Sequence, residues 1–434
     1  MRRLLLLLPL VLGIAVLTLP PSSGAWTDAA SNDGNRFATR QPIRATTYQI
    51  TAGFTGNTYG LALDNDLAAD YFVIMRGAAG NNTNAGNVTP DANSARVTAD
   101  PHGNFTTTTA SNVLRLGRIG TQNDWQGQVT VVESLEPSSA DGFVLRGVAE
   151  VFFDDPDDAG TGAYGPDFAT ANVTAWGSLG QVAVYGGSYG GGVTTQADTV
   201  RDHITAWGMV SAAGSNTVEV YRYADNTNPG GHLNGDTVFT VYAVEWGADW
   251  TIQSVIVTGS SGGNGVNTPG EYDTGAINPV ARANTFVTAS GRSIDNGLGD
   301  GWEGAIWTLG DGVTQNLTEN RVAVGQEYTD TRQAQFFIHT HGALLVDYRF
   351  GPDGSISTNG LSGSQAVDAA SAPATATRIP LISNSSNGTG NAYPRPIVWA
   401  RHSGDTTLTW TRSRAGQPGA YWVQSIDFGE LWRD

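Results

Sequence analysis

Four segments of the chain repeat one pattern in which apolar residues alternate with polar ones. Within the first segment, Leu114 and Leu116 fall on one face of an extended strand. A second strand follows each segment and ends on an acidic residue or a histidine. Four matches in the same order predict an internal repeat, which constrains the fold more than any single motif does. The four segments are 112–118, 216–222, 320–326 and 406–412.

The composition and the turn residues between the short strands define the fold class. The chain contains 56 glycines, and no stretch after the N-terminal leader has the 3.6-residue periodicity of a helix. The sequence therefore predicts an all-β fold of four tandem antiparallel β-sandwich repeats of about 95 residues after a signal peptide. In the second repeat, the recurring strand that precedes segment 216–222 is expected at 203–207. The expected domains are 41–136, 137–248 with a loop insertion near 226–235, 249–342 and 343–434.

The N-terminus has the features of a secretory leader. Arg2 and Arg3 precede an apolar run, and a stretch of small residues then ends at Ala25. This order predicts a signal peptide over 1–25 and a flexible N-terminal arm over 26–40. No later stretch is long and apolar enough to be a transmembrane helix in the mature chain. We therefore expect a secreted protein that is extracellular or attached to the cell surface.

The charge of the chain excludes one class of partner. All 23 basic residues are arginine, and 40 acidic residues give a formal net charge of −17. Such a surface repels the phosphates of nucleic acid, so no nucleic-acid partner is expected. The chain has no cysteine, which excludes disulfides and thiolate metal sites.

The ends of the repeated strands carry a recurring basic residue and a recurring acidic residue. A hairpin would separate the two by about 20 Å, because six strand residues of about 3.4 Å each lie between them. They are therefore predicted to be structural positions at opposite ends of one core face. These positions are Arg118, Glu133, Arg222, Glu245, Gln326, His341, Arg412 and Asp427.

Residues 186–190 read Gly-Gly-Ser-Tyr-Gly and resemble the nucleophile elbow of α/β-hydrolases, with Ser188 in the place of the nucleophile. An elbow requires a helix directly after the serine, whereas further glycines and then Thr194 and Thr195 follow here. The other repeats carry Gly-, Ser- or Asn-rich loops at the same place. We therefore reject the hydrolase interpretation and expect no catalytic residues.

An acidic segment over 154–167 is the best candidate for a metal site, and calcium is the one cofactor that the sequence leaves open. Carboxylates separated by glycines suit Ca²⁺, although the spacing differs from that of an EF-hand and a solvated acidic loop is the alternative. The candidate ligands are Asp154, Asp155, Asp157, Asp158 and Asp167. A looser acidic group contains Asp295, Asp300, Glu303 and Asp311.

His339 and His341 lie two positions apart, on one face of a strand, as metal ligands can. No third ligand is suggested near them, so a buried structural pair is the expected role.

The tandem array without a catalytic constellation favours a non-enzymatic extracellular structural protein. It would be a subunit of a surface layer, filament, tube or adhesin, and its partners would be further copies or other surface proteins joined through sheet edges. An array of carbohydrate-binding modules is the alternative, in which Tyr189, Trp302 and Tyr393 would stack on glycans. An outer-membrane β-barrel is the third hypothesis.

One strand also carries a family resemblance. Residues 241–246 read Val-Tyr-Ala-Val-Glu-Trp, which resembles the closing strand of small H-type-lectin-like and adhesin-type β-sandwiches. The resemblance implies tandem sandwich repeats of a secreted surface protein, and it transfers no sugar-binding residue to this chain.

Overall fold

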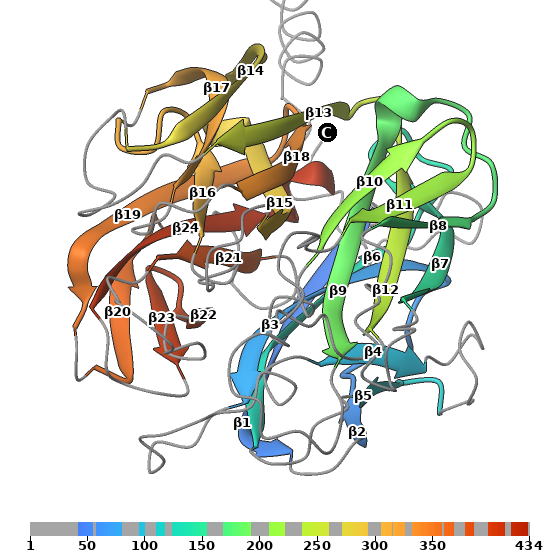
Figure 1. Cartoon of the computed structure of the whole chain (residues 1–434), viewed down its shortest axis with the longest axis horizontal. Coiled ribbons are helices and arrows are strands. Elements are labelled where there is room, and N and C mark those ends of the chain that lie inside the picture. The colour runs from blue at the N-terminus through green and yellow to red at the C-terminus, as the bar shows by residue number, and fades with distance from the viewer. Residues whose placement is uncertain are drawn as a thin grey trace, which may run out of the picture. The chain divides into compact units, whose positions relative to one another are not determined.

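The computed structural model has an all-β, antiparallel fold (Figure 1). The described part contains no α-helix and only three short 3-10 helices, η2 (Leu179–Gln181), η4 (Arg282–Asn284) and η6 (Gly429–Trp432). No helix in this part of the chain has the length and hydropathy that crossing a membrane requires. The predicted signal peptide and N-terminal arm lie outside it. The structure describes residues 42–54, 58–79, 95–99, 110–117, 124–153, 168–191, 208–221, 237–259, 271–293, 305–314, 316–325, 332–357, 360–368, 378–385, 398–412 and 418–432.

The described strands form four successive sets, which Figure 1 colours in order from blue to red. Set 1 contains β1 (Ile43–Phe54), β2 (Thr58–Ala62), β3 (Asp70–Ala79), β4 (Arg96–Ala99), β5 (Val113–Gly117) and β6 (Trp125–Ser134). Set 2 contains β7 (Phe143–Phe153), β8 (Phe168–Asn172), β9 (Val182–Gly191), β10 (Met209–Ala213), β11 (Thr217–Tyr221) and β12 (Thr237–Trp246). Set 3 contains β13 (Thr251–Gly259), β14 (Asp273–Ala281), β15 (Thr285–Ser293), β16 (Ile306–Leu309), β17 (Thr318–Gly325) and β18 (Arg332–Thr340). Set 4 contains β19 (Leu345–Ile356), β20 (Ser362–Ala366), β21 (Arg378–Asn384), β22 (Val398–Gly404), β23 (Thr407–Arg412) and β24 (Gly419–Asp427).

Each set forms two three-stranded antiparallel sheets with the same pairing order. In set 1 the sheets are β1-β6-β3 and β2-β5-β4, so β6 and β5 are the middle strands. The same order gives β7-β12-β9 and β8-β11-β10 in set 2, β13-β18-β15 and β14-β17-β16 in set 3, and β19-β24-β21 and β20-β23-β22 in set 4. The residue boundaries of the domains stay predictions.

The fourth strand of set 2 differs from the expected position. It lies at Met209–Ala213, whereas 203–207 lies outside the described residues. Gly214 has a φ of 58°, a left-handed conformation that glycine adopts without strain, and it turns the chain directly from β10 into β11. The strand that pairs with β11 must therefore be the one immediately before this turn.

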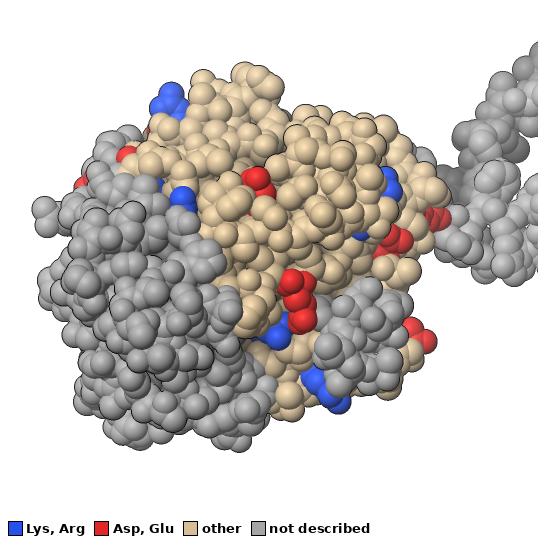
Figure 2. All heavy atoms as spheres, turned by 45° about the vertical axis from the view of Figure 1, so that its right-hand side comes forward, with Lys and Arg blue, Asp and Glu red and all other residues tan. Residues whose placement is uncertain are grey.

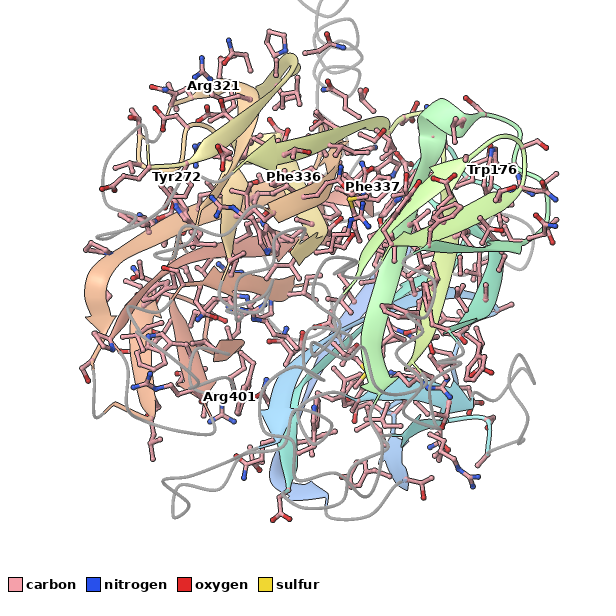
Figure 3. The ribbon with its side chains drawn as sticks, in the orientation of Figure 1. Trp176, Tyr272, Arg321, Phe336, Phe337 and Arg401 are labelled. Carbon is pink, nitrogen blue, oxygen red and sulfur yellow. The ribbon has the colours of Figure 1, made fainter. Side chains whose placement is uncertain are left out.

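The middle strands explain which residues form the core. In β5, Leu114 and Leu116 are fully buried, as are Val218 and Val220 in β11. The middle strand of the other sheet is buried on both faces, so β6 and β24 also bury polar residues. Phe336 and Phe337, adjacent in β18, are both buried (Figure 3). Because a buried polar group is costly without a hydrogen bond, the partners of these polar side chains show how the sets are joined.

Candidate functional site

The outer strands β4, β10, β16 and β22 lie against the following set. β4 contacts β9 and β12, β10 contacts β15 and β18, and β16 contacts β21 and β24. β22 of set 4 contacts β3 and β6 of set 1. The four sets therefore make one closed cycle of contacts, and each contact uses the same strands.

A side chain from the next set hydrogen-bonds the backbone of each of these outer strands at an equivalent residue. Val97, Val210, Trp307 and Ala400 are equivalent because they pair with Leu116, Val220, Val324 and Trp410 of the middle strands. Their partners are the side chains of Thr240, Ser290, Ser383 and Gln128, at 2.8–3.0 Å. Exposed edge groups can template pairing with another chain. These bonds occupy edge groups of all four strands within the chain itself.

The contact between sets 4 and 1 contains several polar side chains. The Gln128 side chain accepts a hydrogen bond from Ala400 N at 2.9 Å and donates one to Pro380 O at 2.9 Å. Arg76 donates to Val398 O and to Asn384 Oδ1, both at 2.6 Å. Burial lowers the pKa of the Arg76 guanidinium to about 10. A partly buried cation is costly without its acceptors, so we expect these two bonds to help hold set 4 against set 1.

The acids at the ends of β6 and β12 are held by arginines from the first strand of their own sets. Glu133 accepts from Arg44 at 2.6 and 2.7 Å and from Ala68 N at 2.9 Å. Glu245 accepts from Arg146 Nε at 2.6 Å and from the amides of Gly177 and Ser178. Sequence reasoning missed both arginines, although antiparallel pairing of the first and last strands of a set places Arg44 directly opposite Glu133.

The remaining repeat positions have other surroundings. Arg412 donates to Gly360 O at 2.7 Å and to Ser357 O at 2.6 Å. Asp427 Oδ1 accepts from Gly429 N at 2.8 Å, which closes the last turn. Arg118, Arg222 and Gln326 lie outside the described residues.

The junctions between sets meet at one cluster. Asp141 follows β6, Asp249 follows β12 and His341 follows β18, and their ligand atoms lie within 4.8 Å of one another. The sequence suggested no third ligand near the two histidines. That expectation was wrong, because folding brings residues from three separate junctions together. This cluster could hold a metal ion only if the His341 nitrogen that faces the carboxylates were free.

Hydrogen bonds show that this nitrogen is engaged. Ala343 N donates to His341 Nδ1 at 3.2 Å, so Nδ1 carries a lone pair and the proton of the neutral ring sits on Nε2. Nε2 lies 3.0 Å from Asp141 Oδ1, to which it donates. Metal-bound histidines instead donate their other nitrogen to an acceptor. The geometry therefore fits a hydrogen-bonded tie between junctions rather than a metal centre.

His339 has a different environment, in the core. Its Nε2 lies 2.7 Å from the hydroxyl of Tyr185, and its ring stacks on Phe286 with centroids 4.3 Å apart. The Tyr185 hydroxyl also accepts from Trp246 Nε1 at 3.0 Å. Burial lowers the pKa of His339 to about 3, so the ring is neutral. Among the described residues, the group of potential metal ligands that contains His341 does not include His339, whose Nε2 lies against the Tyr185 hydroxyl.

Of the other predicted site residues, the structure describes Ser188 and Tyr189, which lie in β9, and Asp311. Ser188 lies inside β9, where its neighbour Tyr189 pairs with Phe239, so no strand-to-helix turn surrounds it. Asp311 Oδ1 accepts from Val313 N at 3.2 Å and Thr314 N at 2.8 Å, as in a polar turn. The residues outside the described part are Asp154, Asp155, Asp157, Asp158, Asp167, Asp295, Asp300, Glu303, Trp302 and Tyr393. Calcium and glycan binding at these positions stay predictions.

The comparisons with known proteins give no relative from which a role could be transferred. No family model matches the chain, and no curated protein and no solved structure matches it either.

Proposed function

We propose that this chain is a non-enzymatic extracellular structural protein that serves as a subunit of a surface layer, filament, tube or adhesin. The observation that carries the proposal is the closed cycle in which each set binds the edge of the previous one. Such a cycle favours a rigid block, because no set can move without breaking hydrogen bonds to its neighbours on both sides.

The buried polar residues support the same role. Thr240, Ser290, Ser383 and Gln128 bond backbone groups of a neighbouring set, and His341 ties two junctions. Buried polar side chains whose hydrogen bonds join neighbouring sets are what we expect of a structural scaffold. The predicted leader supports export of this block from the cell.

Electron microscopy of the native producer tests the proposal. Immunogold labelling against this chain is expected to mark a regular layer, a filament or an appendage on the cell surface. Labelling confined to the cell interior, or a soluble secreted protein bound to no surface structure, would contradict it. The purified protein, imaged at increasing concentration, shows whether the chain assembles by itself or needs another surface component.

A further inference from the structure

The contact between set 4 and set 1 differs from the other three contacts between sets, because no peptide segment joins its two sides. The chain runs directly from each of the first three sets into the next, through the junctions at Asp141, Asp249 and His341. β22 of set 4 instead meets β3 and β6 of set 1, from the opposite end of the described chain (Figure 1). We call each contact between sets a seam, and this one the closing seam. Non-covalent contacts alone hold it.

The apolar core continues across the other three seams but is interrupted at β22. Val97 of β4, Val210 of β10 and Ile306 of β16 belong to one continuous cluster of buried residues, which also includes residues of the sets that they contact. Val398 and Ala400 of β22 belong to a second, smaller cluster, whose described members all come from set 4. Burial of apolar surface is the main term that resists the separation of packed elements. Separating β22 from set 1 is therefore expected to expose less apolar surface than separating the equivalent strands.

Long polar side chains bridge the closing seam instead. Gln128 and Arg76 of set 1 bond groups of set 4, and Gln49 Nε2 donates to Ala400 O at 3.2 Å. The equivalent bonds at the other three seams come from the short hydroxyl side chains of serine or threonine. Once a seam is open, water replaces the partners of its polar groups, so the net loss for each hydrogen bond is small. The closing seam is thus the seam expected to open at the lowest cost.

We propose that the closing seam opens and that β22 of one copy then binds β3 and β6 of a second copy in place of its own set 1. A second copy fits because it carries the same set 1 surface that binds β22 within one chain, where Gln128 bonds Ala400 N and Arg76 bonds Asn384. The two surfaces differ from each other, so the contact is head-to-tail, and its repetition builds a filament unless it closes into a ring. This inference rests on the proposed structural role and supplies the contact through which copies assemble.

Concentration decides between the closed chain and the exchanged contact. Within one chain the two sides of the seam meet at an effective concentration of about millimolar or higher. Dilute copies are therefore expected to stay closed, and copies crowded at a surface are expected to exchange. The net charge of −17 makes copies repel one another at long range. Figure 2 shows one face of the molecule, on which the Arg and acidic residues of the described part are scattered and form no patch of a single sign that would add to this repulsion.

Hydrogen exchange of the wild-type protein tests the opening. The amides of Val210, Trp307 and Ala400 each donate to a side chain of a neighbouring set. After correction for intrinsic rates, the amide of Ala400 is expected to exchange about tenfold or more faster than the other two, because local opening exposes it first. Equal rates at the three amides would show that the closing seam is no weaker than the others and would overturn the proposal.

Two full-length variants test the exchange between copies. Arg76→Glu damages the set 1 side of the seam, because it removes both bonds of the guanidinium and places a carboxylate against Val398 O. Asn384→Arg damages the set 4 side, because it places a second cation against Arg76. Each variant alone is expected to sediment as a monomer. An equimolar mixture is expected to form a heterodimer, about tenfold or more tighter than either homodimer, because the intact β22 of the first variant meets the intact set 1 of the second.

The double variant, with Arg76→Glu and Asn384→Arg in one chain, is the matched control. Its new ion pair restores the seam, so a closed monomer is expected. Hydrogen exchange at Val210 and Trp307 reports whether the other seams are intact, and a mixture that stays monomeric while both amides remain protected would refute the exchange. If either variant loses this protection, wild-type copies decide: dimers formed at millimolar concentration in mild urea that persist on dilution support the exchange, and their absence overturns it.

The two proposals fail in different ways. A mixture that stays monomeric overturns the exchange at the closing seam, while surface labelling of the producer still tests the structural role. Conversely, a heterodimer without any labelled surface structure would sustain the exchange and overturn the structural role.

Discussion

The hydroxyl of Ser383 in β21 accepts a hydrogen bond from Trp307 N at 3.0 Å and donates one to Trp307 O at 2.8 Å. One side chain of set 4 thus satisfies both backbone groups of a residue at the edge of set 3. Ser383 is fully buried, and Trp307 is 8% exposed. If the Ser383 hydroxyl were removed, water could not easily reach the Trp307 backbone groups. Losing this bond should therefore lower the free energy of unfolding by more than losing a bond at the surface.

Ser383→Ala is expected to lower the free energy of unfolding by about 1–3 kcal/mol, because it leaves the Trp307 N–H and C=O buried without a partner. Urea titration measures the change. Ser364→Ala, on the exposed outer strand β20, is the matched control and is expected to stay within about 0.5 kcal/mol of wild type. A loss at Ser383 no larger than that of the control would show that the two sets do not depend on this bond.

Gln128→Ala and Gln128→Glu test the contact that closes the cycle. The alanine variant is expected to lose about 1–3 kcal/mol, since Ala400 N and Pro380 O both lose their partner. The glutamate variant is expected to lose about 3 kcal/mol or more at neutral pH, because a buried carboxylate would face the Pro380 carbonyl.

Hydrogen exchange locates the effect of the Gln128 variants. The amide of Ala400 is expected to exchange faster in Gln128→Ala, while that of Val210, which bonds Ser290 on the opposite side of the cycle, keeps its wild-type rate. Equal acceleration of both amides would mean that the variant loosens the whole chain rather than one contact.

Acid is expected to destabilise the protein through His339. Its pKa is about 3 in the folded protein, because burial disfavours the charged ring, and about 6.5 in the unfolded chain. The unfolded chain therefore binds the extra proton, and this contribution to stability is complete above pH 6.5. It is lost as the pH falls from about 6.5 to about 3, at up to about 1.4 kcal/mol per pH unit.

His339→Phe removes the titrating group and keeps a ring to stack on Phe286. The variant is expected to lose about 1–3 kcal/mol at pH 7, where the Tyr185 hydroxyl loses its bond to the imidazole. Its stability is expected to fall less steeply below pH 6.5 than that of wild type. Burial and then Arg378 lower the pKa of His402 to about 4, so a smaller acid dependence persists. Identical slopes in urea titrations at pH 7, 5.5 and 4.5 would exclude His339 as the source.

Glu245→Ala is expected to cost about 1–2 kcal/mol, because Arg146 and the amides of Gly177 and Ser178 lose one shared acceptor. Glu150→Ala breaks the more exposed ion pair with Arg96 and is expected to cost less than about 1 kcal/mol. Thermal and urea unfolding of the two variants measure the difference. Equal costs would show that the three donors around Glu245 add nothing beyond a surface ion pair.

Local patterns along the chain were sufficient to predict the fold class. Alternation in segments such as 216–222 places Val218 and Val220 on one face, and this period of two follows from strand geometry alone. The strand expected at 203–207 was misplaced, because a short apolar stretch there competes with the one next to the Gly214 turn. Such ambiguity arises wherever two neighbouring segments have similar strand propensity.

The sequence by itself determined that the chain is all-β and antiparallel, because alternation and turn residues are local properties. Only the tertiary structure decided which polar residues form the hydrogen bonds between the sets. Gln128 and Ala400 lie far apart in the chain, and nothing local to either predicts their bond. The junction residues Asp141 and His341 meet for the same reason, since contacts between sets depend on how the sheets close into a cycle.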